Sequence, residues 1–180
     1  MAKTDRKTID TIFTLLGAGM TLVLLVGGIL GFVAYRFATG TVHDQLTAQQ
    51  IYFPPKGSPA LDPQEFPGLQ KYAGQMVDNG PKAKAFADEY IAVHLKKIAG
   101  GKTYSEISAA SVADPSNQQL KQQAQTLFQG ETLRGMLLGD GYAYWTMGQI
   151  AGVASIACFV GAAVMFVLVL LGVRHIARAK

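Results

Sequence analysis

The stretch TIFTLLGAGMTLVLLVGGILGFVAY, residues Thr11–Tyr35, decides the architecture of this chain. It contains no Asp, Glu, Lys or Arg over 25 residues. About 20 apolar residues are enough for an α-helix to cross a hydrocarbon core of about 30 Å. A second stretch, YWTMGQIAGVASIACFVGAAVMFVLVLLGV at Tyr144–Val173, belongs to an uncharged run of 33 residues that begins at Gly141. We therefore predict two transmembrane helices, at 11–35 and 144–173.

The charges outside these stretches predict which way the helices point. The tails, 1–10 and 174–180, carry six basic and two acidic residues, whereas 36–143 carries ten of each. Short basic tails stay in the cytoplasm, and a long domain is translocated largely regardless of its charge. We expect cytoplasmic tails at 1–10 and 174–180 and an extracytoplasmic domain at 36–143, which makes the chain a multi-pass protein of the plasma (inner) membrane with both termini cytoplasmic.

The first apolar stretch has a competing interpretation, a cleaved signal peptide with a charged start. Signal-peptide cores are usually 7–15 residues long, and no small-x-small cleavage site closes this much longer run. An anchor is therefore favoured. The sequence pI of 9.2 arises from the tails, so we expect anionic lipid headgroups, and not nucleic acid, as their partner.

The sequence of the middle stretch, 36–143, predicts helices joined by an irregular segment. Residues 52–69 hold five of the seven prolines, which favours irregular or polyproline-like backbone, either a surface connector or a ligand for a proline-binding groove. A first helix is expected from Asn79-Gly80-Pro81 to a stop at Gly100-Gly101. The visible apolar positions form only a small core, which suggests stability borrowed from a partner.

Later signals predict a second helix that starts near Asp114-Pro115-Ser116. Thr103 and Glu106 have capping-box spacing and predict a short turn before it. Four glycines, Gly130, Gly135, Gly139 and Gly141, leave open whether this helix continues into the second span. The chain is thus expected to be an all-α membrane protein, with two transmembrane helices flanking an extracytoplasmic domain that is helical and partly irregular.

The sequence offers little sign of a nucleotide or metal site. AGGKT at 99–103 resembles the tail of a phosphate-binding loop, but Lys96 stands where the first glycine is required, and a helix precedes the motif where a strand should. The topology separates His175 from His43 and His94, which have no ligand spacing with an acid such as Asp44 or Glu89. We expect no nucleotide, metal, cofactor or catalytic residue.

The spans offer contact surfaces instead, because small residues four apart let helix backbones approach closely. The candidate contact residues are Gly27, Gly31, Gly148, Gly152, Ala157 and Gly161. They can pack on another protein, or the two spans can pack on each other. Cys158 is expected to be a small buried hydrophobe.

Two sequence pieces carry a resemblance: Gly101-Lys102-Thr103-Tyr104 and Gly130-Glu131-Thr132-Leu133-Arg134-Gly135. From about Tyr35 to its end the chain resembles a family of small actinobacterial two-span membrane proteins, often labelled aromatic ring-opening dioxygenases and otherwise uncharacterised as enzymes. The resemblance implies two spans around a periplasm-side helical segment. Glu131 and Arg134, three apart, are expected to pair with each other or to contact a partner.

These patterns favour a non-enzymatic accessory or stabilising subunit of a larger inner-membrane complex, such as an envelope lipid transporter or a respiratory assembly. The expected partners are membrane lipids and other membrane-protein subunits. The alternative is a free-standing extracytoplasmic binding or sensing module anchored by two spans. An enzyme with an outer metal site is the third hypothesis.

Overall fold

The computed structural model describes residues 3–178 and the side chains of residues 6–178. This part of the chain is 83% helical and contains no strand, apart from an isolated antiparallel bridge between Tyr52 and Met76. It forms two compact units. We call Met1–Phe37 with Gly148–Lys180 the helix pair, and Ala38–Met147 the middle domain.

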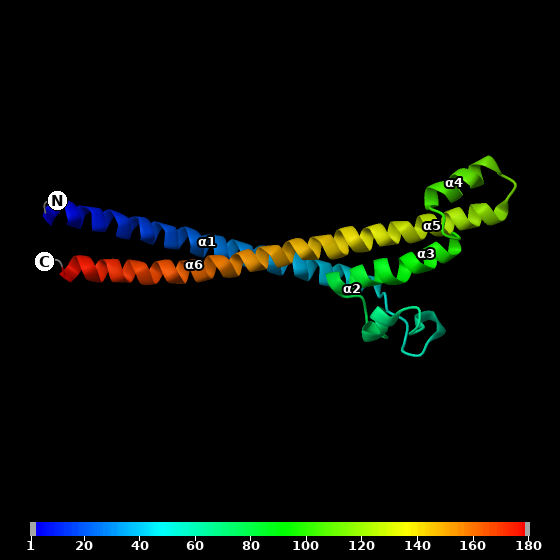
Figure 1. The fold of residues 1–180 in the computed structure, drawn as a ribbon, viewed down its shortest axis with the longest axis horizontal. Helices are drawn as coiled ribbons and strands as arrows, with labels where there is room; N and C mark the ends of the chain where they lie inside the picture. The colour runs from blue at the N-terminus through cyan, green and yellow to red at the C-terminus, as the bar shows by residue number, and fades with distance from the viewer. Residues whose placement is uncertain (1–2, 179–180) are drawn as a thin grey trace. The chain divides into compact units, whose positions relative to one another are not determined.

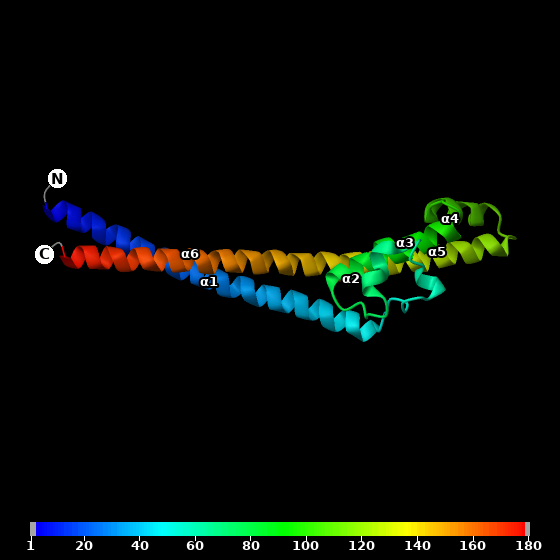
Figure 2. The ribbon, with the colours of Figure 1, turned by 60° about the horizontal axis from the view of Figure 1, so that its bottom comes forward.

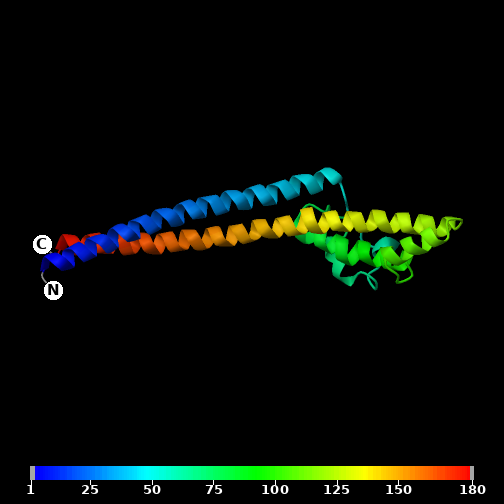
Figure 3. The same cartoon turned by 90° about the horizontal axis from the view of Figure 1, so that it is seen from above.

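The helix pair consists of the apolar parts of α1 (Lys3–Gln49) and α6 (Tyr144–Arg178), which run antiparallel and side by side (Figures 1 and 3). Both are long and apolar enough to cross a membrane. Only 17% of the most apolar window in the first helix and 6% of that in the second is buried. Side chains such as Leu16, Val23 and Val153 therefore face outward. The structure confirms the prediction of an all-helical chain with two apolar helices of membrane-spanning length.

The helix that carries the first span is longer than predicted. We expected 11–35, but α1 continues to Gln49, because the polar residues after Tyr35 include no proline and leave the helical hydrogen bonds intact. It ends where Gln50 adopts a left-handed backbone with a φ of 52°. The last turns of α1 thereby become part of the middle domain.

The first predicted helix of the middle domain is confirmed as α2 (Gly80–Ala85), η3 (Phe86–Ile91) and α3 (Ala92–Ile98), which follow one another without a break. The Asn79 side chain caps its start by accepting a hydrogen bond from the Lys82 N–H at 3.0 Å. Gly100 and Gly101 end it with φ values of 59° and 84°. The widened π-helical turn of η3 was not predicted.

The next two helices differ from the prediction at their starts. Thr103 and Glu106 form the complete capping box, but it opens the ten-residue helix α4 (Tyr104–Ala113) and not a short turn. The AGGKT stretch therefore precedes a helix. The prediction that the following helix starts near Asp114 was wrong, because Asp114 bonds Ser116 in a turn. Asn117 instead caps α5 (Gln118–Met136) through the Leu120 N–H.

The question of helix continuity is also settled. The chain is helical without interruption from Gln118 to Arg178, through the π-helical segment η4 (Leu137–Ala143). Its glycines lower helix propensity but remove no backbone donor, so the helix widens there and does not break. Figure 2 shows α3 and α4 lying beside α5.

The proline-rich segment contributes to the core of the middle domain. It contains two short 3₁₀ helices, η1 (Pro59–Leu61) and η2 (Pro67–Tyr72). Phe53, Leu61 and Leu69 are at most 1% exposed, so the segment is an irregular connector packed on the helices. These side chains were not counted in the expected core, which drew only on the helical positions. The buried cluster comprises Val42, Leu46, Phe53, Leu61, Phe66, Leu69, Val77, Ala83, Ala85, Phe86, Ala87, Ile91, Leu95, Ala99, Ile107, Leu127 and Leu137.

Candidate functional site

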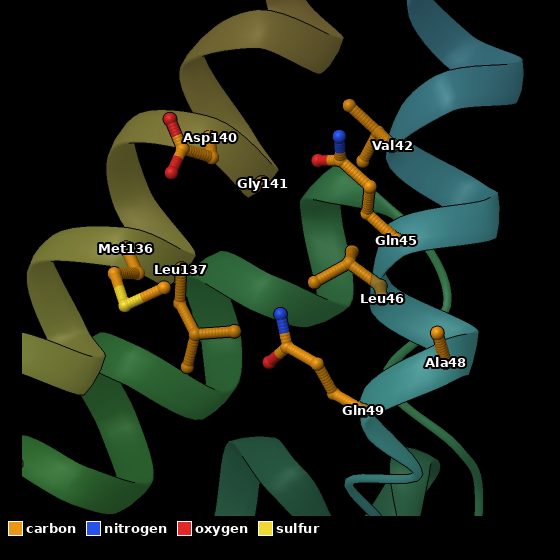
Figure 4. Close-up of a pocket in the computed structure, with 9 residues that line it drawn as sticks. All are labelled: Val42, Gln45, Leu46, Ala48, Gln49, Met136, Leu137, Asp140 and Gly141. Carbon is orange, nitrogen blue, oxygen red and sulfur yellow. The ribbon is translucent and has the colours of Figure 1, made fainter.

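A groove in the middle domain separates the last turns of α1 from the end of α5 and η4 (Figure 4). Its volume is about 280 Å³. Nine residues line it: Val42, Gln45, Leu46, Ala48, Gln49, Met136, Leu137, Asp140 and Gly141. The floor is apolar and the rim is polar, which is the usual pattern of a recognition surface.

The α1 wall supplies both the apolar floor and the polar rim of the groove, because neighbouring residues of a helix point in different directions. Val42 and Leu46, four residues apart, are buried at 1% and 4% exposure. Gln45 and Gln49, also four apart, are exposed. In Figure 4 both amides extend from α1 toward the facing helix. The described residues form no hydrogen bond with either amide, so both are available to a ligand.

The opposite wall depends on the π-helical segment η4. Leu137 closes the floor at 1% exposure. A Cβ at Gly141 would lie 3.0 Å from the Ala83 Cβ, and 3.7 Å from the nearest Leu46 methyl, so any larger residue there would crowd Ala83. Asp140 stands on the rim with its carboxylate turned away from α1 in Figure 4. Such π-helical turns frequently occur at functional sites.

Asp140 differs from most acids of the middle domain. Seven of the ten acidic residues in 36–143 form a side-chain hydrogen bond or an ion pair: Asp62, Glu65, Asp78, Asp88, Glu106, Asp114 and Glu131. Among described residues, Asp44, Glu89 and Asp140 have neither. Of these three, only Asp140 lines the groove. An unpaired, exposed carboxylate therefore stands on the rim of the groove and is turned away from α1.

A separate charged network surrounds the predicted pair of Glu131 and Arg134. The two side chains do pair, with Nη1 of Arg134 2.7 Å from Oε2 of Glu131. Arg134 also donates from Nε to the Ala87 carbonyl at 3.0 Å, and from Nη2 to Asp88 at 3.4 Å. The Ala87 carbonyl belongs to η3 and accepts the i+5 N–H of Ala92 as well. Arg134 thus stabilises the widened turn of η3 and ties it to α5.

The same network sets the charge of Asp88. A hydrogen bond from Lys84 at 2.5 Å lowers the pKa of Asp88 below its usual value, and Arg134 lowers it further. The same bond raises the pKa of Lys84. Both groups are charged and mutually satisfied at neutral pH. We interpret this network as structural, since its charges are already paired.

The predicted contact glycines of the helix pair mostly face the other helix of the same chain. A Cβ at Gly31 would lie 3.1 Å from the Ser155 Cβ, and one at Gly152 would lie 3.0 Å from the Tyr35 ring. Gly27 faces Cys158 and Gly161 faces Leu24. The structure therefore contains the self-packing arrangement of the two helices.

The other two predicted contact positions of α6 differ from each other. Gly148 is buried and Ala157 is exposed. A contact between the spans and another protein stays a prediction, and Ala157 is the one candidate position whose side chain is open to it.

The two histidines of the middle domain, His43 and His94, each contact a different backbone carbonyl. Nδ1 of His43 is 3.0 Å from the Asp78 carbonyl, and Nδ1 of His94 is 2.9 Å from the Tyr90 carbonyl. His94 also stacks on Phe66 with the ring planes 3° apart. Across residues 3–178, no three His, Cys, Asp or Glu side chains lie close enough to hold a metal ion.

The groove was missed by sequence reasoning. Its two walls come from segments about 90 residues apart, and the only signal was Gly141, which we had interpreted solely as a possible helix breaker. Comparison of the chain with protein-family models, curated proteins and solved structures finds no match.

Proposed function

We propose that the chain is a non-enzymatic accessory subunit of a larger inner-membrane complex. In this proposal α1 and α6 cross the membrane, 36–143 lies outside, and both termini lie in the cytoplasm. The outward-facing apolar side chains of the helix pair support insertion in lipid. The basic tails support the orientation.

The proposal that the middle domain binds a partner rests on the groove. Elsewhere in this domain most acids are paired and the apolar side chains form a buried cluster. The groove instead combines an apolar floor with two free amides, and an unpaired carboxylate stands on its rim. Interfaces often place their strongest contacts in such partly desolvated pockets surrounded by polar groups. The arrangement suits recognition of another surface.

The proposal specifies the kind of complex and not the individual complex. The resemblance to small actinobacterial two-span proteins favours a cell-envelope setting. An envelope lipid transporter and a respiratory assembly both contain membrane subunits of the kind that the proposal requires. The exposed apolar faces of α1 and α6 would be shared between lipid and those subunits.

Chemical cross-linking in native membranes, followed by mass spectrometry, tests the proposal. We expect recurrent cross-links from the middle domain to the same one or two membrane proteins, and co-purification with them in mild detergent. Recovery of a lone monomer, cross-linked only to itself and to lipid, would overturn it. A reporter fused after Lys180 should be active only in the cytoplasm.

A second candidate is a free-standing binding or sensing module. The observation in its favour is the buried cluster of the middle domain, which reduces the need for a stabilising neighbour. Expression of 38–147 without the rest of the chain distinguishes the two. A folded, monomeric domain that binds a cell-wall component or small ligand, with no membrane partner in vivo, would favour this module.

A further inference from the structure

We propose that the helix pair binds one anionic glycerophospholipid at the end that carries the chain termini. One acyl chain lies in a second groove, between α1 and α6, and the headgroup phosphate lies among basic residues of the two tails. This groove, here called the terminal groove, has a volume of about 540 Å³ and is lined by residues within 10–17 of α1 and 165–175 of α6. The inference rests on the membrane insertion in the proposed function and adds a specific ligand to it.

The terminal groove forms where the two helices touch at small residues and separate beside them. A Cβ at Gly17 would lie 3.0 Å from a Val169 methyl. A Cβ at Gly172 would lie 2.6 Å from the Thr14 hydroxyl oxygen, so the backbones are close along the floor. In Figures 1 and 2 the ribbons of α1 and α6 draw apart toward the chain termini. Leu168 also lines the groove and is exposed, so the groove is open to the surrounding medium.

The interior of the terminal groove selects an apolar chain. Apart from Asp10 and His175 at its mouth, the lining contains one hydroxyl and no amide or charged side chain. That hydroxyl belongs to Thr14 and already donates to the Asp10 carbonyl at 2.8 Å. A polar ligand would lose its hydrogen bonds in this interior, whereas a hydrocarbon chain has none to lose. The other side chains of the lining are hydrocarbon or thioether: Phe13, Met165, Leu168, Val169 and Leu171.

The length of the terminal groove matches one leaflet of a bilayer. His175 and Met165 are ten residues apart on α6, which at 1.5 Å per residue places them about 15 Å apart along the helix axis. This is half of a hydrocarbon core of about 30 Å. An acyl chain that enters beside His175, where the proposed function places the cytoplasmic surface, therefore reaches the middle of the membrane near Met165.

The mouth of the terminal groove selects an anion. Its one acid, Asp10, faces a histidine, with Oδ2 of Asp10 3.7 Å from Nε2 of His175. Four further basic side chains are exposed and stand three or four positions from a lining residue, which places them within about one helical turn of the groove: Arg6, Lys7, Arg174 and Arg178. None of the four has a side-chain hydrogen bond or ion pair with a described residue. The mouth therefore carries a surplus of uncompensated positive charge.

An anionic glycerophospholipid satisfies the interior and the mouth together. Its acyl chain suits the apolar groove, and its phosphate accepts the charge-assisted hydrogen bonds that arginine and lysine donate. A soluble anion would leave the groove unfilled. A zwitterionic lipid would bring a positive group of its own to the basic residues, which weakens the attraction.

The test uses the full-length chain, purified in mild detergent and reconstituted into phosphatidylcholine vesicles. Both leaflets contain a small fraction of phosphatidylglycerol with a diazirine in one acyl chain. After irradiation, mass spectrometry locates the attached lipid. We expect attachment concentrated within 10–17 and 165–175, with a yield about fivefold above that of a phosphatidylcholine probe with the same acyl chain. Equal yields from the two probes would overturn the inference.

Two matched pairs of variants separate the headgroup from the acyl chain. Arg174→Gln should lower the yield about fivefold, the usual contribution of one basic residue near an anionic surface. Arg36→Gln, at an exposed basic residue of α1 outside the groove, should leave it unchanged. Leu168→Trp should lower the yield by a similar factor because the indole occupies the groove. Leu170→Trp, at an exposed residue of α6 outside the lining, should not. Equal yields within either pair would overturn the inference.

Failure of this inference can be told apart from failure of the proposed function. Labelling spread evenly over both helices, with outward-facing Val153 labelled as strongly as Leu168, would refute the lipid site and leave the membrane insertion intact. Labelling of neither helix would refute both. The accessory role is tested separately by the protein cross-links in native membranes, which do not depend on this lipid.

Discussion

The helix pair and the middle domain belong to one helical chain and distribute polarity in opposite ways. The middle domain places Phe53, Leu61 and Leu69 inside and its charges outside. The helix pair exposes its large apolar side chains, and the two buried polar side chains of the described chain, Thr21 and Ser155, both lie there. Each donates to a backbone carbonyl. The middle domain thus buries its large apolar side chains, whereas the helix pair turns them outward and buries two hydroxyls that are hydrogen-bonded to its own backbone.

The comparison can first be tested with a disulfide that links α1 to α6 within the helix pair. A Cβ at Gly27 would lie 3.6 Å from the Cys158 sulfur, so a small rotation of the two side chains would bring sulfurs at these positions to bonding distance. Gly27→Cys should therefore form an intrachain disulfide in nearly all molecules under a membrane-permeant oxidant. Protection of both thiols from maleimide labelling measures it. The control is Gly19→Cys, since no heavy atom lies within 4 Å of a Cβ there; equal labelling of the two variants would contradict the packing.

The largest change in stability should come from the core of the middle domain. Phe53 is 1% exposed and packs against Tyr72 and Phe86. Phe53→Ala should lower the free energy of unfolding of this domain by about 3–5 kcal/mol, measured by pulse proteolysis of detergent-solubilised protein. Phe13→Ala, at a side chain that is 70% exposed in the helix pair, should have little effect. Equal effects of the two changes would mean that the two units do not differ in burial.

A middle-sized effect is expected for the network around η3. Arg134→Ala removes the donor to the Ala87 carbonyl and leaves Asp88 with one partner fewer. The loss should be about 2 kcal/mol, as for other hydrogen bonds to charged groups, with faster hydrogen exchange in Phe86–Ile91. Lys121→Ala, at an exposed lysine of the same helix without an ion pair among described residues, is the control. An unchanged exchange rate in η3 would contradict the assigned role.

The pH dependence of the same network gives a smaller effect. The pKa of Asp88 in the folded protein is lowered, chiefly by Lys84. Its contribution to stability is therefore present above the unfolded pKa, near 3.8, and is lost as the pH falls through the lowered folded pKa. Asp88→Asn should be less stable than the wild type at pH 7, and this difference should shrink as the pH is lowered past 3.8. A constant difference would show that the charge of Asp88 is not responsible.

The smallest effect is expected at the hydrogen bond inside the helix pair. Ser155 donates to the Gly28 carbonyl at 2.6 Å. Ser155→Ala should weaken the packing of α1 on α6 by about 0.6 kcal/mol, because interhelical hydrogen bonds in membranes average near this value. Titration with a denaturing detergent measures it. Thr21→Val is the control, since that hydroxyl bonds only within α1. A loss as large as that of Arg134→Ala would contradict the proposed difference between the units.

The features of the fold that could be predicted from the sequence are those marked by residues at the feature itself. Asn79, Gly100 and Gly101 mark helix ends through their own backbone chemistry, and these predictions held. The start of α5 was misplaced by three residues because Asp114 and Asn117 are both good caps, and only the competing bond to Ser116 decides between them.

The rest depended on contacts between distant segments. The groove needs α1 and η4 together, and the burial of Phe53 and Leu69 needs the proline-rich segment to fold against the helices. No periodicity in 52–69 signals this, because irregular backbone does not place its apolar side chains at a fixed spacing. The pairing of Glu131 with Arg134 was predicted from spacing, whereas the bond from Arg134 to the Ala87 carbonyl was not.

The two π-helical turns have a consequence for evolution. Each turn of i+5 bonding holds one residue more than an α-helix does, so loss of a single residue within Phe86–Ile91 or Leu137–Ala143 would restore regular winding without breaking the helix. Descendants of the same ancestor can therefore differ by one-residue gaps inside these helices. Such a deletion at the second site would turn the η4 wall of the groove about the helix axis while the architecture persists.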